Sequence, residues 1–504
     1  MSPRRDLCWW KLLLGPALAA LVLLLGPGEE PGVSRMAAVA VWMAAWWITE
    51  AVPIPVTALL PLVLMPLAGV MGVRDVAPNY GRSTVYLFLG GFMLALGLEA
   101  SGAHRRLALW IVHRVGGQPR RLVLGFMIAT AFLSMWISNT AAVMVMLPIG
   151  MAVLGAAQDR GVAAGDLKRL GVAIMLGIAY AGNIGGMATL VGTPPNLSYK
   201  EQLIRLFPDA PEPSFTQWFL LSLPISILFL SAGWVVLTRF VFRLEAASLL
   251  GSRDAVADVR RQLGPIRRDE LVASAVFAAA AVLWMTRTGL SLGELTIPGW
   301  GSLGPLKPGY VDDAVVAVAM ALLLFVLPSA SRPGEALLTW DAMKRLPWGM
   351  LLLFGGGFAL AAGFQASGLS AWIGHQLEGL AGLPPILLVG AVCLLLTFLT
   401  ELTSNTATTE LVLPVLAAAG VAIGSDPRAL MIPATLSASC AFMMPVASPT
   451  QAIVFASGYV PIRDMVRAGI WFNLIGVTLI TAIFALLCGP VMDIRFDLLP
   501  AWAH

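Results

Sequence analysis

The chain has 504 residues, of which 58% are hydrophobic and only 12% charged, and its mean hydropathy is +0.83. Soluble domains carry roughly 25% charged residues, so this composition excludes an ordinary soluble globule and predicts an all-α polytopic membrane protein. The net charge of +4 is explained by membrane topology and gives no reason to expect a nucleic-acid partner.

The first apolar segment, residues 12–27, follows Arg4, Arg5 and Lys11, and we interpret it as a retained first span. Lysine and arginine gather in the short cytoplasmic loops of membrane proteins. Alternation from a cytoplasmic N-terminus places most of the 32 lysines and arginines inside, in residues 1–11, 103–121, 159–170, 239–268, 331–345 and 463–467. The same alternation leaves the C-terminus outside.

The apolar segment 122–157 has basic residues before and after it, so both of its ends are expected on the cytoplasmic side. Two full crossings need about 40 residues, and this segment is shorter. It is therefore predicted to be a re-entrant hairpin with Ser138-Asn139-Thr140 at its tip. Irregular backbone at membrane depth is tolerated where it meets protein or a watery cavity, which suits a polar tip.

The tripeptide recurs as Ser404-Asn405-Thr406, at an offset that also aligns residues 87–102 with residues 353–368. Each of these copies contains a glycine pair, at 90–91 and 356–357, that is expected to allow close helix packing. Residues 103–122 carry five arginines, whereas the aligned residues 369–388 carry no lysine or arginine. Opposite charge bias predicts that the two halves are inverted repeats.

The expected fold therefore has 11 transmembrane helices and two re-entrant hairpins. The predicted divisions are the N-terminus with the first helix (1–35), the first repeat (36–242, hairpin 122–157), a cytoplasmic linker (243–270), the second repeat (271–493, hairpin 385–424) and a C-terminal tail (494–504).

Each half contains a second polar break after its hairpin. These breaks are residues 182–186 with 192–196 in the first half, and residues 447–451 in the second. Glycine and proline interrupt a helix and free carbonyl oxygens, which are hard ligands of the kind that Na⁺ prefers. The helix N-termini that follow such breaks favour an anion. One pocket could thus hold cation and anion together.

Two acidic residues, Glu401 and Glu410, flank the second tip, where the first half has Met135 and Met144. Intramembrane carboxylates are candidates for function, so direct contact with substrate is one hypothesis for this pair.

At these motifs the chain resembles the divalent-anion:sodium symporter family of di- and tricarboxylate or sulfate transporters. The resemblance rests on the paired Ser-Asn-Thr tips, on Gly192-Thr193-Pro194-Pro195-Asn196, and on residues 439–448, and it covers nearly the whole chain. It implies a homodimer that works as an elevator, with a transport domain sliding against a scaffold domain. Gln451 departs from the family, which commonly has asparagine there.

The resemblance also implies two sodium sites, one at Ser134, Ser138, Asn139 and Gly192 and one at Thr400, Ser404, Asn405 and Ala447. The substrate residues that it implies are Ser138, Asn139, Thr140, Thr193, Ser404, Asn405, Thr406, Ser448 and Pro449.

The resulting prediction is sodium-coupled uptake of a C4-dicarboxylate such as succinate, malate or fumarate, in a bacterial inner membrane. No cofactor is expected besides Na⁺ as coupling ion, and the expected partners are the substrate, membrane lipid and a second copy of the chain. A sodium-independent exchanger and a sulfate or citrate transporter remain alternatives. No histidine lies in a predicted span, which disfavours an enzyme, and no lysine or arginine lies near the tips, which disfavours an anion channel.

Overall fold

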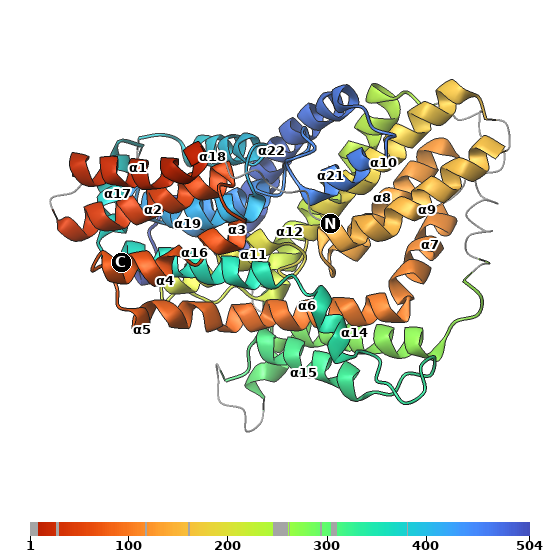
Figure 1. Ribbon diagram of the computed structural model, residues 1–504, viewed down its shortest axis with the longest axis horizontal. Helices are drawn as coiled ribbons and strands as arrows, with labels where there is room; N and C mark the ends of the chain where they lie inside the picture. The colour runs from red at the N-terminus through yellow and green to blue at the C-terminus, as the bar shows by residue number, and fades with distance from the viewer. Residues whose placement is uncertain are drawn as a thin grey trace.

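Helices make up almost all of the regular structure in the computed structural model, which describes residues 9–26, 30–115, 118–159, 162–244, 261, 263–292, 295–303, 310–380 and 382–503 (Figure 1). Within these ranges, eight helical segments are long and apolar enough to cross a bilayer, and further apolar helices are shorter. This agrees with the predicted helical membrane fold. The total of 11 spans stays a prediction.

The first half consists of helices with short interruptions. They are α1 (Trp9–Leu25), α2 (Pro31–Thr49), α3 (Ile54–Thr57), α4 (Leu60–Leu67), α5 (Val73–Val76), η1 (Ala77–Gly81), α6 (Ser83–Ser101), α7 (Ala103–Val115), α8 (Pro119–Ser134), α9 (Asn139–Asp159), α10 (Ala164–Gly186), α11 (Pro194–Leu206), α12 (Phe215–Val235) and the π-helix η2 (Val236–Val241).

The second half begins with α14 (Arg268–Arg287). It continues through β1 (Leu290–Leu292), β2 (Leu295–Ile297), η3 (Trp300–Ser302), α15 (Asp313–Val326), η4 (Trp340–Arg345), α16 (Trp348–Ala366), α17 (Leu369–Leu377), η5 (Glu378–Leu380), α18 (Pro385–Leu399), α19 (Asn405–Ala422), α20 (Arg428–Ser437), α21 (Pro449–Ala456), α22 (Ile462–Met492) and η6 (Ala501–Ala503).

The strands β1 and β2 form one short hairpin in a connector of the otherwise helical structure. They pair antiparallel, with Leu290 opposite Ile297. Gly289 and Pro298 bracket this segment, and both residues disfavour continuing a helix. A connector this short can form a two-stranded turn instead.

The two predicted hairpins correspond to α8 with α9 and to α18 with α19. Proline begins each first arm, at a position where its missing N–H costs nothing. At the first tip, Ser138 Oγ accepts a hydrogen bond from Ala141 N at 3.2 Å. At the second, Ser404 Oγ accepts one from Ala407 N at 3.5 Å. The serine of each tripeptide thus caps the second arm of its hairpin.

Helices of the two halves interleave around the hairpins. Helix α10 packs along both α8 and α9, and α20 packs in the same way along α18 and α19. Contacts of α10 with α21, of α11 with α19 and of α12 with α22 join the halves. In Figure 1 the hairpin formed by α8 and α9 lies toward one end of the molecule, while α1, α2 and α17 lie at the other.

A second group of helices, α6, α14 and α15, packs together along one side of the molecule (Figure 1). A smaller apolar core joins α2, α4 and α16 through residues such as Met36, Met43, Trp47, Met65 and Leu360. The latter of these groups contacts the hairpin region, since α16 packs against α19.

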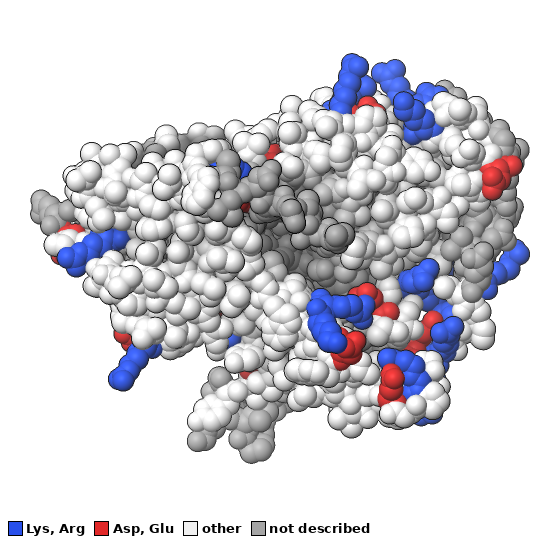
Figure 2. All heavy atoms as spheres, in the orientation of Figure 1, with Lys and Arg blue, Asp and Glu red and all other residues white. Residues whose placement is uncertain are grey.

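The outer surface suits a bilayer. On the face shown in Figure 2 charged side chains are few, and much of the surface is uncharged. Large apolar side chains point outward, with Leu67 81% and Val326 77% exposed. Such exposure is expected where lipid replaces water.

The predicted linker 243–270 lies largely outside the described residues. In its described part, Arg106 on α7 binds the Glu270 carboxylate at 2.7 Å and donates to Pro265 O at 3.0 Å. Helix α14 begins at Arg268, so it starts slightly earlier than the predicted second repeat.

Candidate functional site

The first hairpin tip and the break after α10 bring together a group of oxygen atoms from Ser134, Asn139, Gly182 and Gly192, which we call the first half-site. Ser134 Oγ lies 2.7 Å from Asn139 Oδ1 and donates to Gly182 O at 2.6 Å. The same end of the Asn139 amide lies 3.3 Å from Gly182 O and 3.2 Å from Gly192 O.

This arrangement has two uses, depending on the amide orientation. With Nδ2 at the shared end, Asn139 donates to the surrounding oxygens. With Oδ1 there, neutral oxygens converge from a hydroxyl, an amide and two carbonyls, as they do around a hard cation. Three of the residues predicted for the first sodium site, Ser134, Asn139 and Gly192, are thus in contact, and the structure adds Gly182.

Glycine is required where the break turns back on itself. A Cβ on Gly192 would lie 2.4 Å from Gly186 O, and one on Gly186 would lie 2.4 Å from Asn139 Oδ1. Asn196 holds the break by donating from Nδ2 to Thr189 O at 2.7 Å and to Gly186 O at 3.2 Å. The Thr189 hydroxyl in turn donates to Met135 O at the hairpin tip.

The second break is held in the same way. Gln451 Nε2 donates to Ala441 O at 2.5 Å, ten residues before it, just as Asn196 donates to Gly186 O ten residues before it. Gln451 Oε1 also accepts from the hydroxyls of Ser448 and Thr450. The extra methylene of glutamine is therefore accommodated, and the bond that asparagine makes in the first half is kept.

Asn183, in the last turn of α10, links the two half-sites. Its Oδ1 accepts from Thr450 Oγ1 at 3.1 Å, and its Nδ2 donates to Ser448 Oγ at 3.4 Å. When Asn139 Oδ1 is at the shared end, Asn183 Oδ1 also accepts from Asn139 Nδ2 at 3.4 Å. Sequence reasoning placed Asn183 in a polar break without giving it a role. A buried asparagine within an apolar helix is the signal that could have identified it.

Glu401 joins the second tip to the second break. Its carboxylate accepts hydrogen bonds from Phe442 N at 2.7 Å, Met443 N at 2.9 Å, Met444 N at 3.2 Å and Asn473 Nδ2 at 2.7 Å. These four donors occupy the carboxylate, so Glu401 positions the second break and is not available to contact a substrate.

The remaining predicted residues of the second sodium site are less closely assembled than those of the first. Thr400 and Ala447 are buried, and Asn405 Oδ1 is a buried oxygen that accepts no hydrogen bond from the residues described. Thr400 Oγ1 donates back to Leu396 O at 2.9 Å within its own helix. Over the described ranges, no hydrogen bond connects Asn405 with Ala447.

The charge at the site comes from the backbone. Helices α9, α11, α19 and α21 all begin at a tip or a break, at Asn139, Pro194, Asn405 and Pro449. A helix N-terminus carries unpaired N–H groups and about half a positive charge. The predicted substrate residues Thr140, Thr193, Thr406 and Ser448 lie at or next to these N-termini, and Pro449 begins one of them. The arrangement favours an anion without an arginine or lysine.

Metal-binding clusters of acidic, histidine or cysteine side chains are absent from the described part of the chain. The oxygen ligands available at the half-sites are neutral, which suits a monovalent cation better than zinc or another transition metal.

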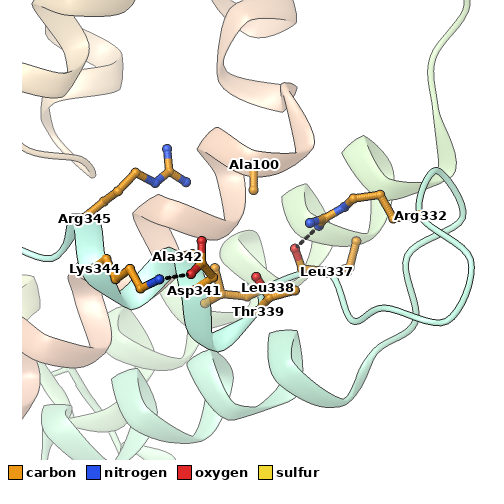
Figure 3. Close-up of a pocket in the computed structure, with 9 residues that line it drawn as sticks. All are labelled: Ala100, Arg332, Leu337, Leu338, Thr339, Asp341, Ala342, Lys344 and Arg345. Atoms are coloured by element: carbon orange, nitrogen blue, oxygen red, sulfur yellow. Dashed lines mark hydrogen bonds and ion pairs between the residues drawn. The ribbon is translucent and has the colours of Figure 1, made fainter.

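A surface hollow of about 480 Å³ lies away from this site and contains none of the predicted site residues (Figure 3). Its cations already have partners. Lys344 pairs with Asp341 and Arg345 binds Glu99 at 2.9 Å, while Arg332 donates to Leu337 O at 2.9 Å. The hydrogen bond from Lys344 holds the pKa of Asp341 below its usual value.

Comparison with known proteins places these features in a family context. The model of the sodium:sulfate symporter transmembrane region matches residues 7–493. The sodium-dependent dicarboxylate transporter SdcS of Staphylococcus saprophyticus is 40% identical over 492 residues, which cover 96% of this chain and 92% of that protein. SdcS of Staphylococcus aureus strain RF122 is 41% identical over 476 residues, covering 93% and 89%.

The fold also resembles a solved structure, the crystal structure of the Alcanivorax borkumensis YdaH transporter. The TM-score is 0.51 at 17% identity, and the match covers 83% of this chain and 87% of the YdaH chain. At this identity the likeness concerns the fold alone.

Proposed function

The chain belongs to the sodium:sulfate symporter family, and we propose that within it the protein imports C4-dicarboxylates such as succinate, malate or fumarate together with Na⁺. The family and the similar relatives are transporters, so the protein is a transporter and not an enzyme. The relatives that are about 40% identical over most of their length are named for sodium-dependent dicarboxylate transport. That name is the main support for this substrate class.

The observation that carries sodium coupling is the first half-site. Ser134 Oγ lies 2.6 Å from Gly182 O there. The shared end of the Asn139 amide lies 3.3 Å from Gly182 O and 3.2 Å from Gly192 O. We assign one Na⁺ to this group, with Ser138 at the tip beside it. We assign a second Na⁺ to Thr400, Ser404, Asn405 and Ala447, supported by the buried Asn405 Oδ1, which has no hydrogen-bond partner within the described part of the chain.

The substrate carboxylates would lie at the helix N-termini that begin at the tips and breaks, between the two sodium sites. One carboxylate would meet Ser138, Asn139, Thr140 and Thr193, and the other Ser404, Asn405, Thr406, Ser448 and Pro449. A dianion has no lysine or arginine to meet it at these tips, so bound Na⁺ would supply the missing charge. Because binding linkage is reciprocal, each ligand then tightens the other by the same factor.

An elevator mechanism is the motion that we propose. The moving unit would contain α8–α12 and α18–α22, and the scaffold α1–α7 and α14–α17. Two ion pairs join α11 to the proposed scaffold. Lys200 binds Asp313 at 2.8 Å, and Glu201 binds Arg82 at 2.6 Å. When α11 slides along the scaffold, the charged side chains of these ion pairs can bind water in place of their partners. We further propose a homodimer in a bacterial inner membrane, with its N-terminus inside and its C-terminus outside.

Reconstitution into proteoliposomes tests the function directly. With empty vesicles, inward Na⁺ should drive accumulation of labelled succinate, and replacing Na⁺ by K⁺ should abolish it. Uptake that needs internal dicarboxylate and ignores Na⁺ would favour the exchanger instead. Competition by sulfate or citrate, in place of malate and fumarate, would favour the remaining alternative within the family.

A further inference from the structure

We propose that Glu410 is a proton-binding site whose protonation is linked to binding of the anionic substrate. The inference rests on the transport function proposed above. Glu410 lies on α19, the helix that begins at the second tip, and it has no exposed surface. An intramembrane carboxyl group is a functional candidate when its partners do not neutralise it.

Neutral groups surround the Glu410 carboxyl. Ser198 Oγ lies 2.5 Å from Oε1, and Gln202 Nε2 donates to Oε2 and also to Glu410 O at 3.2 Å. On α16, a Cβ at Gly357 would lie 2.1 Å from Oε2. The second residue of the glycine pair 356–357 therefore makes room for this carboxyl group, which gives that motif a more specific role than helix packing.

Charged groups on the surrounding helices have other partners. On α11, Lys200 pairs with Asp313 and Glu212, and Glu201 pairs with Arg82. Arg205, also on α11, has no ion pair among the described residues and a buried Nε without a hydrogen-bond partner there, and the charges that act on it are Arg82 and Glu201.

The other helices that contact α19 add no closer cation. Arg428 on α20 pairs with Asp426, His375 on α17 pairs with Glu378, and Arg35 on α2 is exposed. Helix α16 contains no charged residue. The charged group that interacts electrostatically with Glu410 is another carboxylate, that of Glu201. An ionised Glu410 would thus be buried without a cation, a state that proteins avoid by neutralising the group.

The Ser198 hydroxyl can share a proton with the Glu410 carboxyl group. Ser198 Oγ lies 2.5 Å from Glu410 Oε1, which is a hydrogen-bond distance. Ser198 Oγ also lies 3.3 Å from Pro194 O. Ser198 can therefore donate to Pro194 O and accept a hydrogen bond from the protonated Glu410, so both the hydroxyl and the carboxyl group have partners.

Glu401 shows the opposite case in the same helix pair. Its carboxyl group accepts hydrogen bonds from four N–H donors, which hold the second break. The two acidic residues that flank the second tip thus have different partners. Glu401 has N–H donors only, whereas Glu410 has one hydroxyl group and one side-chain amide.

The link to substrate follows from where α11 and α19 begin. Pro194 and Asn405 start these helices at the proposed anion site, and Glu410 joins the helices through Ser198. Glu410 is five residues from Asn405, about 7.5 Å along the helix axis. When Glu410 loses its proton to water, a negative charge appears near the substrate dianion and weakens its binding. Proton binding and substrate binding should then favour each other.

Glu410→Gln tests this proposal, because glutamine has the shape of the neutral acid and cannot titrate. Apparent KM for succinate is measured in proteoliposomes between about pH 7 and about pH 9, where a dicarboxylate stays fully ionised. In the unmodified protein KM should rise with pH by a factor of about 10, the size expected for charges at this separation in a partly screened interior. In Glu410→Gln it should stay constant. Matching pH profiles for the two proteins would overturn the proposal.

A second measurement does not depend on transport. The infrared spectrum of the purified unmodified protein near neutral pH should contain a protonated-carboxyl C=O band that is absent from Glu410→Gln. Glu401→Gln is the matched control, and it should retain the band. If the band is unaffected in Glu410→Gln, the proton site is wrong even if succinate is transported. If the band disappears as expected but no sodium-driven uptake is found, the proposed function fails while the proton site stands.

Discussion

Gly186 gives the sharpest test of the first half-site, because a single methyl group should disrupt it. A Cβ added at Gly186 would lie 2.4 Å from Asn139 Oδ1 and 3.2 Å from Gly192 O. The Asn139 amide must then turn away from Ser134, Gly182 and Gly192. The loss of one hydrogen-bonding contact to a charged ligand costs about 1.5 to 3 kcal/mol, which corresponds to roughly 10- to 150-fold weaker binding.

We therefore expect Gly186→Ala to raise the Na⁺ concentration for half-maximal uptake by at least about 10-fold. The assay is sodium-dependent uptake of succinate, accompanied by the thermal stabilisation that Na⁺ gives to the purified protein. Gly155→Ala is the matched control, since it is also on a helix of this region but its Cβ would contact nothing within 4 Å. An unchanged Na⁺ dependence in Gly186→Ala would refute the assignment of this half-site.

Three further predictions concern the site, the charge network and the topology. Asn139→Ala and Asn405→Ala should each reduce sodium-dependent uptake at least about 10-fold while the protein still elutes as a folded species; near-normal uptake in either would contradict the paired half-sites. Asp313→Asn removes the buried charge that faces both Lys200 and Arg287. It should destabilise the protein by about 3 to 5 kcal/mol in denaturation in detergent, and an unchanged midpoint would show that the network contributes little. In a background without native cysteines, Gln118→Cys should react with an impermeant thiol reagent only from the cytoplasm and Leu383→Cys only from outside. Reaction of both from one side would rule out the inverted repeat.

The sequence alone predicted the membrane class, the family and the placement of both hairpin tips. These features depend on local information. Apolar runs identify helices, and Ser138 and Ser404 cap the second arms in the way that their side chains favour. The first arm of the first hairpin begins at Pro119, slightly before the predicted residue 122. The family assignment is confirmed by the match over residues 7–493.

Tertiary structure decided which of the polar residues meet. The link through Asn183 joins residues more than 260 positions apart, and no local pattern encodes such a contact. The same holds for Gln451. The sequence did not indicate whether its longer side chain could replace asparagine, and the structure answers this with its hydrogen bond to Ala441 O. The different environments of Glu401 and Glu410 also follow from packing, because the sequence places both beside the same motif.

What the sequence determined was therefore the kind of residue at each position and the local element that holds it. Periodicity, caps and helix breaks are properties of a few neighbouring residues, so they can be recognised in the sequence without knowledge of the fold. Whether a buried oxygen faces a backbone N–H, a hydroxyl or another oxygen depends on helices brought together from both halves of the chain. Only the packing of α8–α11 against α19–α21 fixed those partners, and with them the candidate sites for Na⁺, substrate and proton.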